Sequence, residues 1–246
     1  MSTELLLLIE VVATFTTLLL INKFLGKEGL IGWIAIATIL ANVFTVKSAL
    51  FSFGWGYTEG TVLFASVFLA TDFLTERYGK EVANKGVLIG LISSLALIIF
   101  GQWQLFYSPA PWSIEMNEAL SVVFGLSLRV TISSVVMYFI ANRVDVWLYD
   151  KLKKKTKGKH MWLRNNVSTI LCNCLENFFF MFGAFLFVEG YDVATIFEMA
   201  ITTSVVEMLV GLLDTPFLYA GMSMVKSEPV KEVPEFVPEE SEEILG

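Results

Sequence analysis

The sequence is poor in the residues on which most catalytic and metal centres depend. Its 246 residues include one histidine and two cysteines, and only 17% of them are charged. His160 has no metal-ligating companion at helical spacing, and Cys172 and Cys174 point in different directions from one expected helix. We therefore expect no cofactor, no metal centre and no structural disulfide. GxSxG, P-loop and HExxH motifs are absent too, which leaves only carboxylate-based intramembrane chemistry to an enzyme.

Charge is scarce except near the C-terminus, where seven carboxylates and Lys231 follow Lys226. We interpret residues 228–246 as an acidic, disordered cytoplasmic tail and residues 1–227 as one transmembrane domain. Without the tail the chain is near neutral, so no nucleic-acid partner is expected despite the net charge of −7. The N-terminus lacks the basic region of a secretory signal peptide, so the first apolar run is expected to remain as a helix.

Hydrophobic residues are abundant instead. They form 55% of the chain, with 21 phenylalanines, and the mean hydropathy is +0.67. Seven apolar segments are long enough, or nearly so, to cross about 30 Å of hydrocarbon. They are Leu5–Ile21, Leu30–Phe53, Thr61–Tyr78, Gly86–Tyr107, Leu120–Tyr149, Val167–Val188 and Ile196–Val225. The sequence therefore predicts an all-α, polytopic transmembrane bundle of seven helices, with the lipid bilayer as its surroundings.

Basic residues predict the orientation of these helices. Fourteen of the 17 Lys and Arg residues follow the first, third, fifth and seventh segments, and the loops between them hold acids instead. Because Lys and Arg concentrate in cytoplasmic loops, the N-terminus is expected outside and the C-terminus inside. The third segment is the shortest, and it must cross the membrane for this pattern to hold.

Four segments place polar residues where lipid would otherwise be expected. A charged residue at the centre of a bilayer costs about 2.5–3.5 kcal/mol on insertion scales, so such residues face the bundle interior and mark function. In each segment they recur at helical spacing and share one face. They are Asp72 and Glu76 in the third segment, Asn142 and Asp145 in the fifth, Asn166, Asn173, Glu176 and Asn177 in the sixth, and Glu207 and Asp214 in the seventh. Pro216 follows Asp214, and we expect it to break the seventh helix.

Some of these acids have a structural interpretation as well. Glu76 can emerge from the membrane at the helix end and pair with Arg77 or Lys80. Asp145 can belong to the inner interface, where Arg143 or the lysine-rich loop would neutralise it. Asparagines in membrane helices also bind neighbouring helices, at about 0.6–2 kcal/mol each.

Two cations and one amide complete the candidate site. Asn42 lies near the middle of the second segment, with Lys47 in its outer part. Lys47 either extends outward to the interface or contacts a ligand. Arg129 lies on a different face from Asp145, and its planar five-donor head suits an acceptor-rich ligand or a buried carboxylate. The interior thus holds more acids than bases, which favours a small polar solute with donor groups, or a proton or cation pathway.

Four blocks of the chain resemble the queuosine precursor transporter family, also called the vitamin-uptake-transporter type. FLATDFLTERYGK is similar to its TD-x-x-x-E-x-x-G signature, and RVTISSVVMYFIANRVDVWLYDKLKKKTKGKH to its Arg-to-Asp-Val helix and basic loop. MWLRNNVSTILCNCLENFFFMFGAF and ANVFTVKSALFSFG are similar to two further elements. Relatives often have Asp where Glu176 stands, and some begin one helix later. The first segment is therefore expected to be an accessory helix beside a six-helix core.

The resemblance implies a bacterial inner-membrane transporter without its own ATPase. It would import a nucleobase or nucleoside (preQ0, preQ1, queuine or queuosine) for tRNA modification. Coupling to a proton or another cation, and a homodimer, stay open. So do a substrate-capture subunit that needs an energising module, an intramembrane enzyme and a scaffold.

The candidate residues are assigned to two groups. The expected substrate-binding residues are Asn42, Lys47, Arg129, Asn173, Glu176, Asn177 and Glu207. The residues expected to gate the inner side or to bury charge between helices are Asp72, Glu76, Asn142, Asp145, Asn166 and Asp214.

Overall fold

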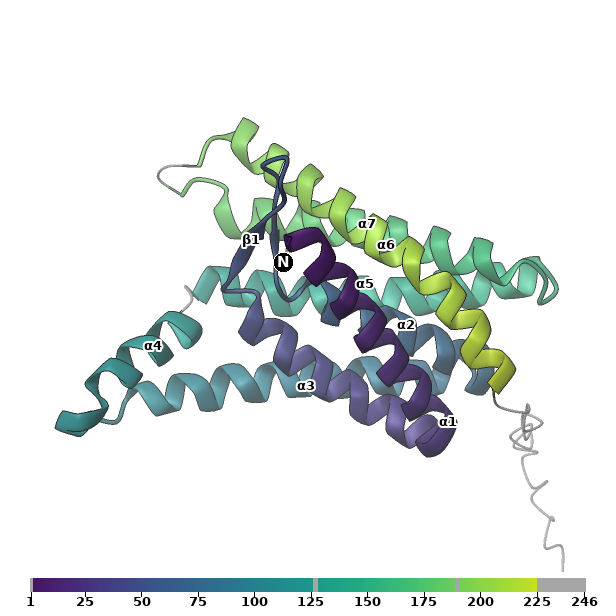
Figure 1. The fold of residues 1–246 in the computed structure, drawn as a ribbon, viewed down its shortest axis with the longest axis horizontal. Coiled ribbons are helices and arrows are strands. Elements are labelled where there is room, and N and C mark those ends of the chain that lie inside the picture. Colours follow the sequence, from purple (N-terminus) through teal and green to yellow (C-terminus); the bar gives the residue numbers. More distant parts are fainter. Residues whose placement is uncertain (1, 126–127, 189–190, 225–246) are drawn as a thin grey trace, which may run out of the picture.

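The chain folds as a bundle of helices with a small β-hairpin at one end (Figure 1). The computed structural model describes residues 2–125, 128–188 and 191–224, with the backbone alone for residues 128, 129 and 131. The elements are α1 (Thr3–Phe44), β1 (Ser48–Leu50), β2 (Gly56–Thr58), α2 (Thr61–Tyr78), α3 (Lys80–Leu105), a 3-10 turn (Pro111–Ser113), α4 (Ile114–Phe124), α5 (Leu128–Lys155), α6 (Met161–Phe185) and α7 (Val193–Met224). The all-α prediction is confirmed, and the predicted tail at 228–246 lies outside the described residues.

The first two predicted segments are the two arms of α1. The helix bends sharply at Gly26, whose φ of 58° and ψ of −141° lie outside the helical region. Glycine adopts such positive φ values without the steric cost that a Cβ would add. The two arms therefore fold back beside each other as a V, drawn in purple in Figure 1.

The second predicted segment is wrong in its last part, because the helix ends at Phe44 and not at Phe53. The chain then forms an antiparallel hairpin in which Ser48 pairs with Thr58. At its turn, the Gly54 N–H donates to the Phe51 carbonyl at 2.9 Å, and Gly54 has a φ of 90°. Aromatic residues interrupted by glycine favour strands and a tight turn over a helix.

The fifth predicted segment is not one helix. Its first part is α4, which ends at Gly125, whose N–H donates to the Ser121 carbonyl at 2.8 Å. Its second part is α5, which extends to Lys155 in the basic loop. α4 lies against the end of α3, where Gln102 donates to the Phe124 carbonyl, and the two helices project from the body of the bundle (Figure 1).

The third predicted segment matches α2 at both ends, and α2 is the central helix of the bundle. It packs against α1, α3, α5 and α7. The Trp33 indole N–H of α1, for example, donates to the Ser66 hydroxyl of α2 at 3.0 Å. Because α2 is covered on nearly all sides, its acidic residues face protein and not lipid.

The remaining helices follow the prediction with shifted ends, except at Pro216. α7 continues through Pro216 to Met224, so the expected break after Asp214 is wrong. Proline removes one backbone hydrogen bond, but helices packed in a membrane bundle tolerate it because neighbouring groups satisfy the freed carbonyl. Asn165 and Asn166 of α6 donate to the Thr215 hydroxyl at this point, at 3.3 and 2.9 Å.

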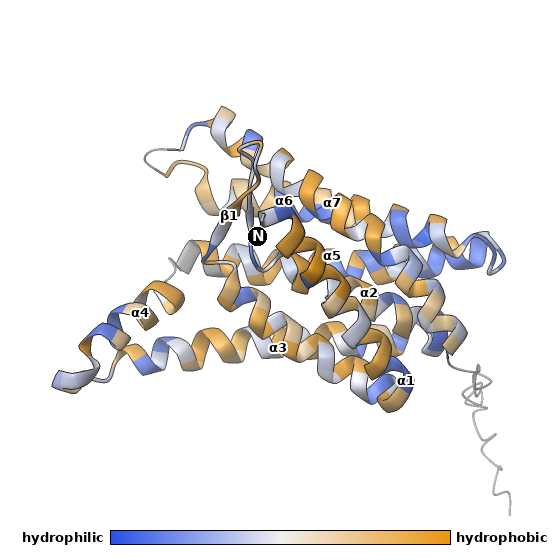
Figure 2. Cartoon of the chain, viewed as in Figure 1, coloured by the Kyte–Doolittle hydropathy of each residue, from blue (hydrophilic) through white to orange (hydrophobic). Residues whose placement is uncertain are grey.

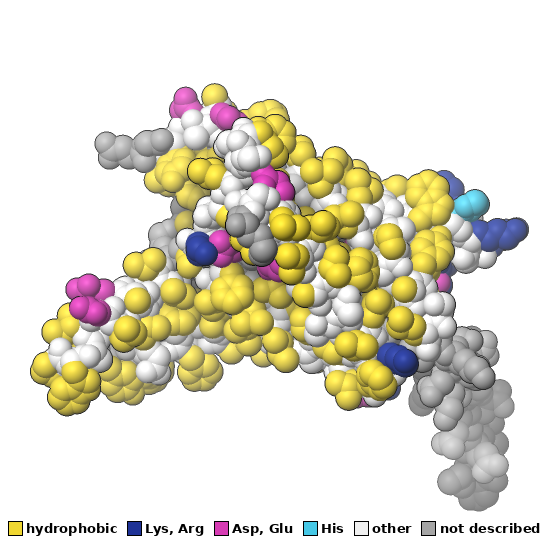
Figure 3. Space-filling model, viewed as in Figure 1, with side chains coloured by type: hydrophobic (Ala, Val, Ile, Leu, Met, Phe, Trp, Pro, Cys, Tyr) yellow, Lys and Arg dark blue, Asp and Glu magenta, His cyan; other side chains and the backbone are white. Residues whose placement is uncertain are grey.

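The outer surface is apolar along the helices and charged at the two ends. Figure 2 shows hydrophobic residues along α1, α3 and α7, and among the described helices α1, α3, α6 and α7 are long and apolar enough to cross a membrane. α2 and α5 hold more polar residues, many of them buried. Figure 3 shows Lys and Arg gathered at the end that holds the 151–159 loop, and acids gathered at the opposite end.

Candidate functional site

A cavity of about 260 Å³ opens between α1, α2, α5, α6 and α7, beside the hairpin. It lies near the hairpin end of the bundle, since Thr58 of β2 and Thr45 form part of its wall. Pockets for small organic ligands have about 300–1,000 Å³, so this cavity suits a compact ligand. Its position, between helices of a bundle, is a common one for a binding site.

Five of the seven predicted substrate-binding residues line this one cavity. They are Asn42, Asn173, Glu176, Asn177 and Glu207. They come from α1, α6 and α7, which means that the helical faces identified in the sequence turn toward one another. The cavity therefore combines two carboxylates with three amides.

The two carboxylates differ in their surroundings. Glu207 accepts a hydrogen bond from the Asn177 amide at 2.7 Å, which holds it in place. Glu176 makes no hydrogen bond or ion pair with any part of the chain that the structure describes. Its oxygens are thus available to a ligand in the cavity.

Aromatic side chains form the apolar walls of the cavity. Phe64 and Phe68 of α2 line one side, and Phe180 and Phe185 of α6 line another. Met181 fills space between the α6 rings and α7. These flat rings offer stacking surfaces for a planar ligand.

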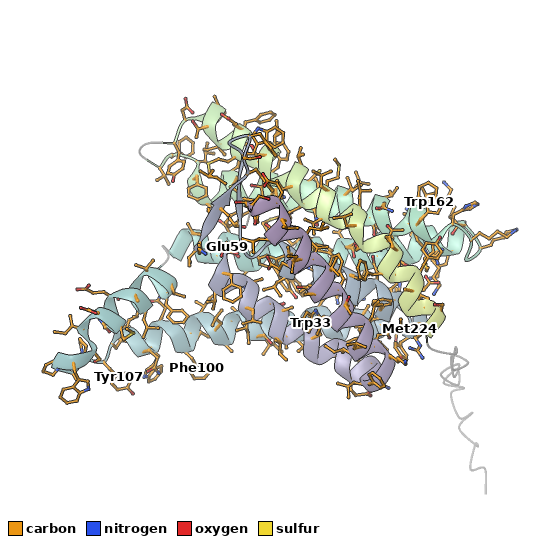
Figure 4. The ribbon with its side chains drawn as sticks, in the orientation of Figure 1. Trp33, Glu59, Phe100, Tyr107, Trp162 and Met224 are labelled. Carbon is orange, nitrogen blue, oxygen red and sulfur yellow. The ribbon has the colours of Figure 1, made fainter. Side chains whose placement is uncertain are left out.

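Of the two predicted cations, Lys47 does not line the cavity. Lys47 lies beyond the end of α1, with its side chain exposed and its ammonium 2.8 Å from Glu59. Figure 4 labels Glu59, which precedes α2 at the hairpin end. The outward interpretation of Lys47 fits this position. Arg129 belongs to the first turn of α5, but its side chain lies outside the described part of the structure.

A second layer of acids lies further along the same helices, away from the hairpin. Asp72 of α2, Asp145 of α5 and Asp214 of α7 are all fully buried. Asn142 is buried beside Asp145, and its amide donates to the Tyr138 carbonyl at 2.9 Å. All four were predicted to gate the inner side or to bury charge, and the structure places them together within the bundle.

The predicted neutralisation of Asp145 by Arg143 is wrong. Arg143 points outward, with its guanidinium over the ring of Phe139 at 5.6 Å. Neither oxygen of Asp145 makes a hydrogen bond of normal geometry in the described chain. The reason is helical geometry, because positions 143 and 145 are two residues apart and face different sides.

Asn165 is a site residue that the helical spacing missed. Its amide donates to Asp214 at 2.6 Å, and its side chain is fully buried. Asn166, which the sequence favoured, is only partly buried and donates to Trp162 and Thr215. The sequence shows two adjacent asparagines, Asn165 and Asn166, but only the packing of α6 against α7 determines which of them binds Asp214.

A third layer at the basic end is built around Glu76. The Arg164 guanidinium of α6 binds its carboxylate through Nη2 at 2.7 Å and Nε at 3.1 Å. Tyr149 donates to it at 3.2 Å and Lys153 lies 3.7 Å away, both from α5. The acid therefore connects α2, α5 and α6.

The local ion pair predicted for Glu76 is wrong. Arg77 donates instead to Asn22 of α1 at 3.3 Å, and Lys80 lies 4.0 Å from Asp150. Arg164 was not singled out from the sequence, although it stands within the block WLRNN. A long arginine side chain can reach across to another helix, which spacing along one helix does not reveal.

Comparison with known proteins identifies the relatives of this chain. The profile of the family described as "Putative vitamin uptake transporter" matches residues 58–221. A protein of Bacillus subtilis named "Probable queuosine precursor transporter" is 33% identical over 215 residues, which cover 87% of this chain and 92% of its own. One of the same name from Haemophilus influenzae is 26% identical over 57% of each chain. No solved structure matches the chain significantly.

The family match covers α2 to α7, and thus most of the cavity and both further layers of buried polar residues. The apolar helices that enclose them are those of a multi-pass membrane protein. The chain therefore belongs to the queuosine precursor transporter family, the vitamin-uptake-transporter type that its sequence blocks resemble.

Proposed function

We propose that this protein is a secondary-type transporter that imports 7-deazaguanine precursors of queuosine across a bacterial inner membrane. The observation that favours this function most is the cavity in which Glu176, without a partner in the described chain, faces amides and aromatic rings. The names of the two relatives support the same class of solute.

The cavity's chemistry suits such a base. A deazaguanine presents its ring N1–H and 2-amino donors on one edge, and a carboxylate accepts both together. Glu176 is the proposed acceptor, and Glu207, held by Asn177, is the second acid for a precursor with an added amine. The Asn173 amide is proposed to donate to the 6-oxo group. The Asn42 amide nitrogen already donates to the Thr38 carbonyl at 2.7 Å and to the Ser94 hydroxyl at 3.5 Å, so Asn42 offers its oxygen instead. The phenylalanine walls would add about 1–3 kcal/mol by stacking on the ring.

The orientation follows from charge. The end with the 151–159 loop is rich in Lys and Arg, and we assign it to the cytoplasm. The hairpin end, beside which the cavity lies, is then outside, together with the N-terminus (Figures 1 and 4). Trp162 and Met224, labelled in Figure 4, lie at the opposite end, at the cytoplasmic side in this assignment.

The function is tested by uptake in cells that lack the precursor pathway, with queuosine in tRNA as the readout. The intact chain should restore queuosine when preQ0, preQ1 or queuine is supplied, and a double substitution of Asn173→Ala and Glu176→Ala should abolish the restoration. Glu198→Gln, an exposed acid on α7 outside the cavity, is the matched control. Failure of every deazaguanine to enter through the intact chain would rule out the function.

Uptake measured with the purified protein in liposomes distinguishes a transporter from a substrate-capture subunit. A substrate-capture subunit would bind the base but would not move it without an energising module. Uptake by the protein alone excludes that rival. Binding without any chemical change of the base argues against an enzyme, and a rise in melting temperature with the base argues against a scaffold.

A further inference from the structure

Three buried carboxyl groups from three helices interact electrostatically within the bundle, and none of them forms an ion pair with another described residue. Asp72, Asp145 and Asp214 have no exposed surface, and Asp72 interacts electrostatically with both of the others. Asp214 also interacts with Asp145. They lie on the far side of the cavity from the hairpin, since Asp214 follows Glu207 by seven residues, about 10 Å of helix.

The same region has hydrogen-bond acceptors without donors. Both oxygens of Asp72 and Asp145, and the Oδ2 atom of Asp214, make no hydrogen bond of normal geometry in the described chain, although the Ser168 hydroxyl of α6 lies close enough to Asp145 to act on its charge. The Asn165 amide donates to Asp214, while its own Oδ1 atom is buried without a donor. The Oδ1 atom of Asn142, one turn before Asp145, is also buried without a donor among the described residues. Buried acceptors that lack donors destabilise the folded chain.

Among the described side chains, no cation forms an ion pair with these three acids. The cation that acts on Asp72 is Arg164, and its guanidinium is already bound to Glu76. The described residues form no group of three or more acids, histidines or cysteines that could hold a metal ion. Three ionised carboxylates left together in the bundle would each cost several kcal/mol.

Binding of a proton would both reduce the negative charge of the three acids and supply a missing hydrogen-bond donor. When it binds, an O–H bond forms on a carboxylate oxygen, which removes one negative charge and creates one donor for a neighbouring acceptor. When it leaves, that bond breaks and the charge returns, without any transfer of electrons. Tyr149 of α5, Cys172 of α6 and the Glu76–Arg164 pair are the other titratable groups that face the three acids.

We propose that Asp72, Asp145 and Asp214 form an exchangeable proton site, separate from the substrate cavity, which takes up and releases a proton in each transport cycle. This proposal rests on the proposed transport function and names its coupling ion. Thr169, buried in α6 against Gly211, lies between the two layers, and its hydroxyl has no hydrogen-bond partner among the described residues. It is the described side chain best placed to pass a proton between them.

The test compares two transport modes in proteoliposomes of the full chain. Asp72→Asn, Asp145→Asn and Asp214→Asn keep the shape of the side chain and mimic its protonated form. Each should lose accumulation of labelled preQ1 driven by a pH gradient, but keep exchange of internal for external preQ1, which needs no net proton movement. Asp150→Asn, a surface acid on α5 paired with Lys154, should keep both modes.

Three outcomes would overturn the site. The first is that all three Asn variants still accumulate preQ1 in response to a pH gradient. The second is that a sodium gradient alone drives accumulation by the unaltered chain. The third is an infrared spectrum of the unaltered protein at neutral pH without the C=O band of a protonated carboxylic acid, or with a band that all three variants retain. The infrared measurement needs no substrate, so it tests the proton site even if the chain transports no deazaguanine. A failure to transport any deazaguanine would refute the proposed function and not the proton site.

Discussion

The Arg164 guanidinium binds the Glu76 carboxylate through two nitrogens, and the two residues lie 88 positions apart in the sequence. Arg164 is 1% exposed, and the ring of Tyr149 lies 5.4 Å from its guanidinium carbon. This contact ties α6 to the central helix α2 at the basic end of the bundle. Because Arg164 is bound to Glu76, no cation among the described side chains is left to pair with the buried acids Asp72, Asp145 and Asp214.

Removal of either partner should destabilise the bundle. Glu76→Gln would leave the buried Arg164 guanidinium without its carboxylate, at a cost of about 3 kcal/mol in the free energy of unfolding. Arg164→Gln should cost less, because Glu76 keeps its contacts with Lys153 and Tyr149. Denaturant unfolding in detergent micelles measures this cost. Lys154→Gln, at an exposed pair with Asp150, should change stability by less than about 1 kcal/mol. The double variant should lose less than the two single losses combined, and simple additivity would contradict the buried pair.

The charge of Glu176 should decide affinity. Glu176→Gln is expected to weaken the binding of preQ1 about 10- to 100-fold, since hydrogen bonds to a charged group contribute about 1.5–3 kcal/mol. Calorimetric titration of the purified protein gives the dissociation constants. Glu198→Gln, outside the cavity, should bind as the unaltered chain does. Equal affinity of the Glu176→Gln variant would remove this residue from the site.

Lys47 should not contribute to binding. Its ammonium pairs with Glu59 at the hairpin, outside the lining of the cavity. We therefore expect Lys47→Met to leave the dissociation constant for preQ1 unchanged and to alter stability by less than about 1 kcal/mol. A clear loss of affinity would show that the side chain reaches the ligand in another state of the transporter.

Close packing of α3 against α5 should make Gly90 intolerant of a side chain. A Cβ at this position would collide with the Tyr138 hydroxyl, whereas a Cβ at Gly32 would meet no atom within 4 Å. Gly90→Ala is expected to cost about 1–3 kcal/mol through overpacking. Gly32→Ala should instead stabilise its helix by up to about 1 kcal/mol. Unfolding of both variants in the same detergent compares the two, and a stabilised Gly90→Ala variant would contradict the contact.

Much of the architecture could be predicted because apolar length and helical periodicity are local properties. The third segment has the predicted ends, and the polar faces of α6 and α7 do line one cavity with Asn42. The hairpin after Phe44 was missed because a short apolar run has the same composition in a strand as in a buried helix. The family resemblance also came from local blocks, and the comparisons confirm it.

The sequence alone determined that the chain is a helical membrane protein whose acids face inward, since charge in lipid is too costly to leave exposed. Only the tertiary structure decided which acid has which partner. Glu76 pairs with Arg164 of another helix and Asp214 accepts a hydrogen bond from Asn165, while Glu176 lines the cavity without a partner among the described residues. The physical reason is that spacing along a helix specifies a face, whereas a partner depends on how that helix is rotated and shifted against its neighbours.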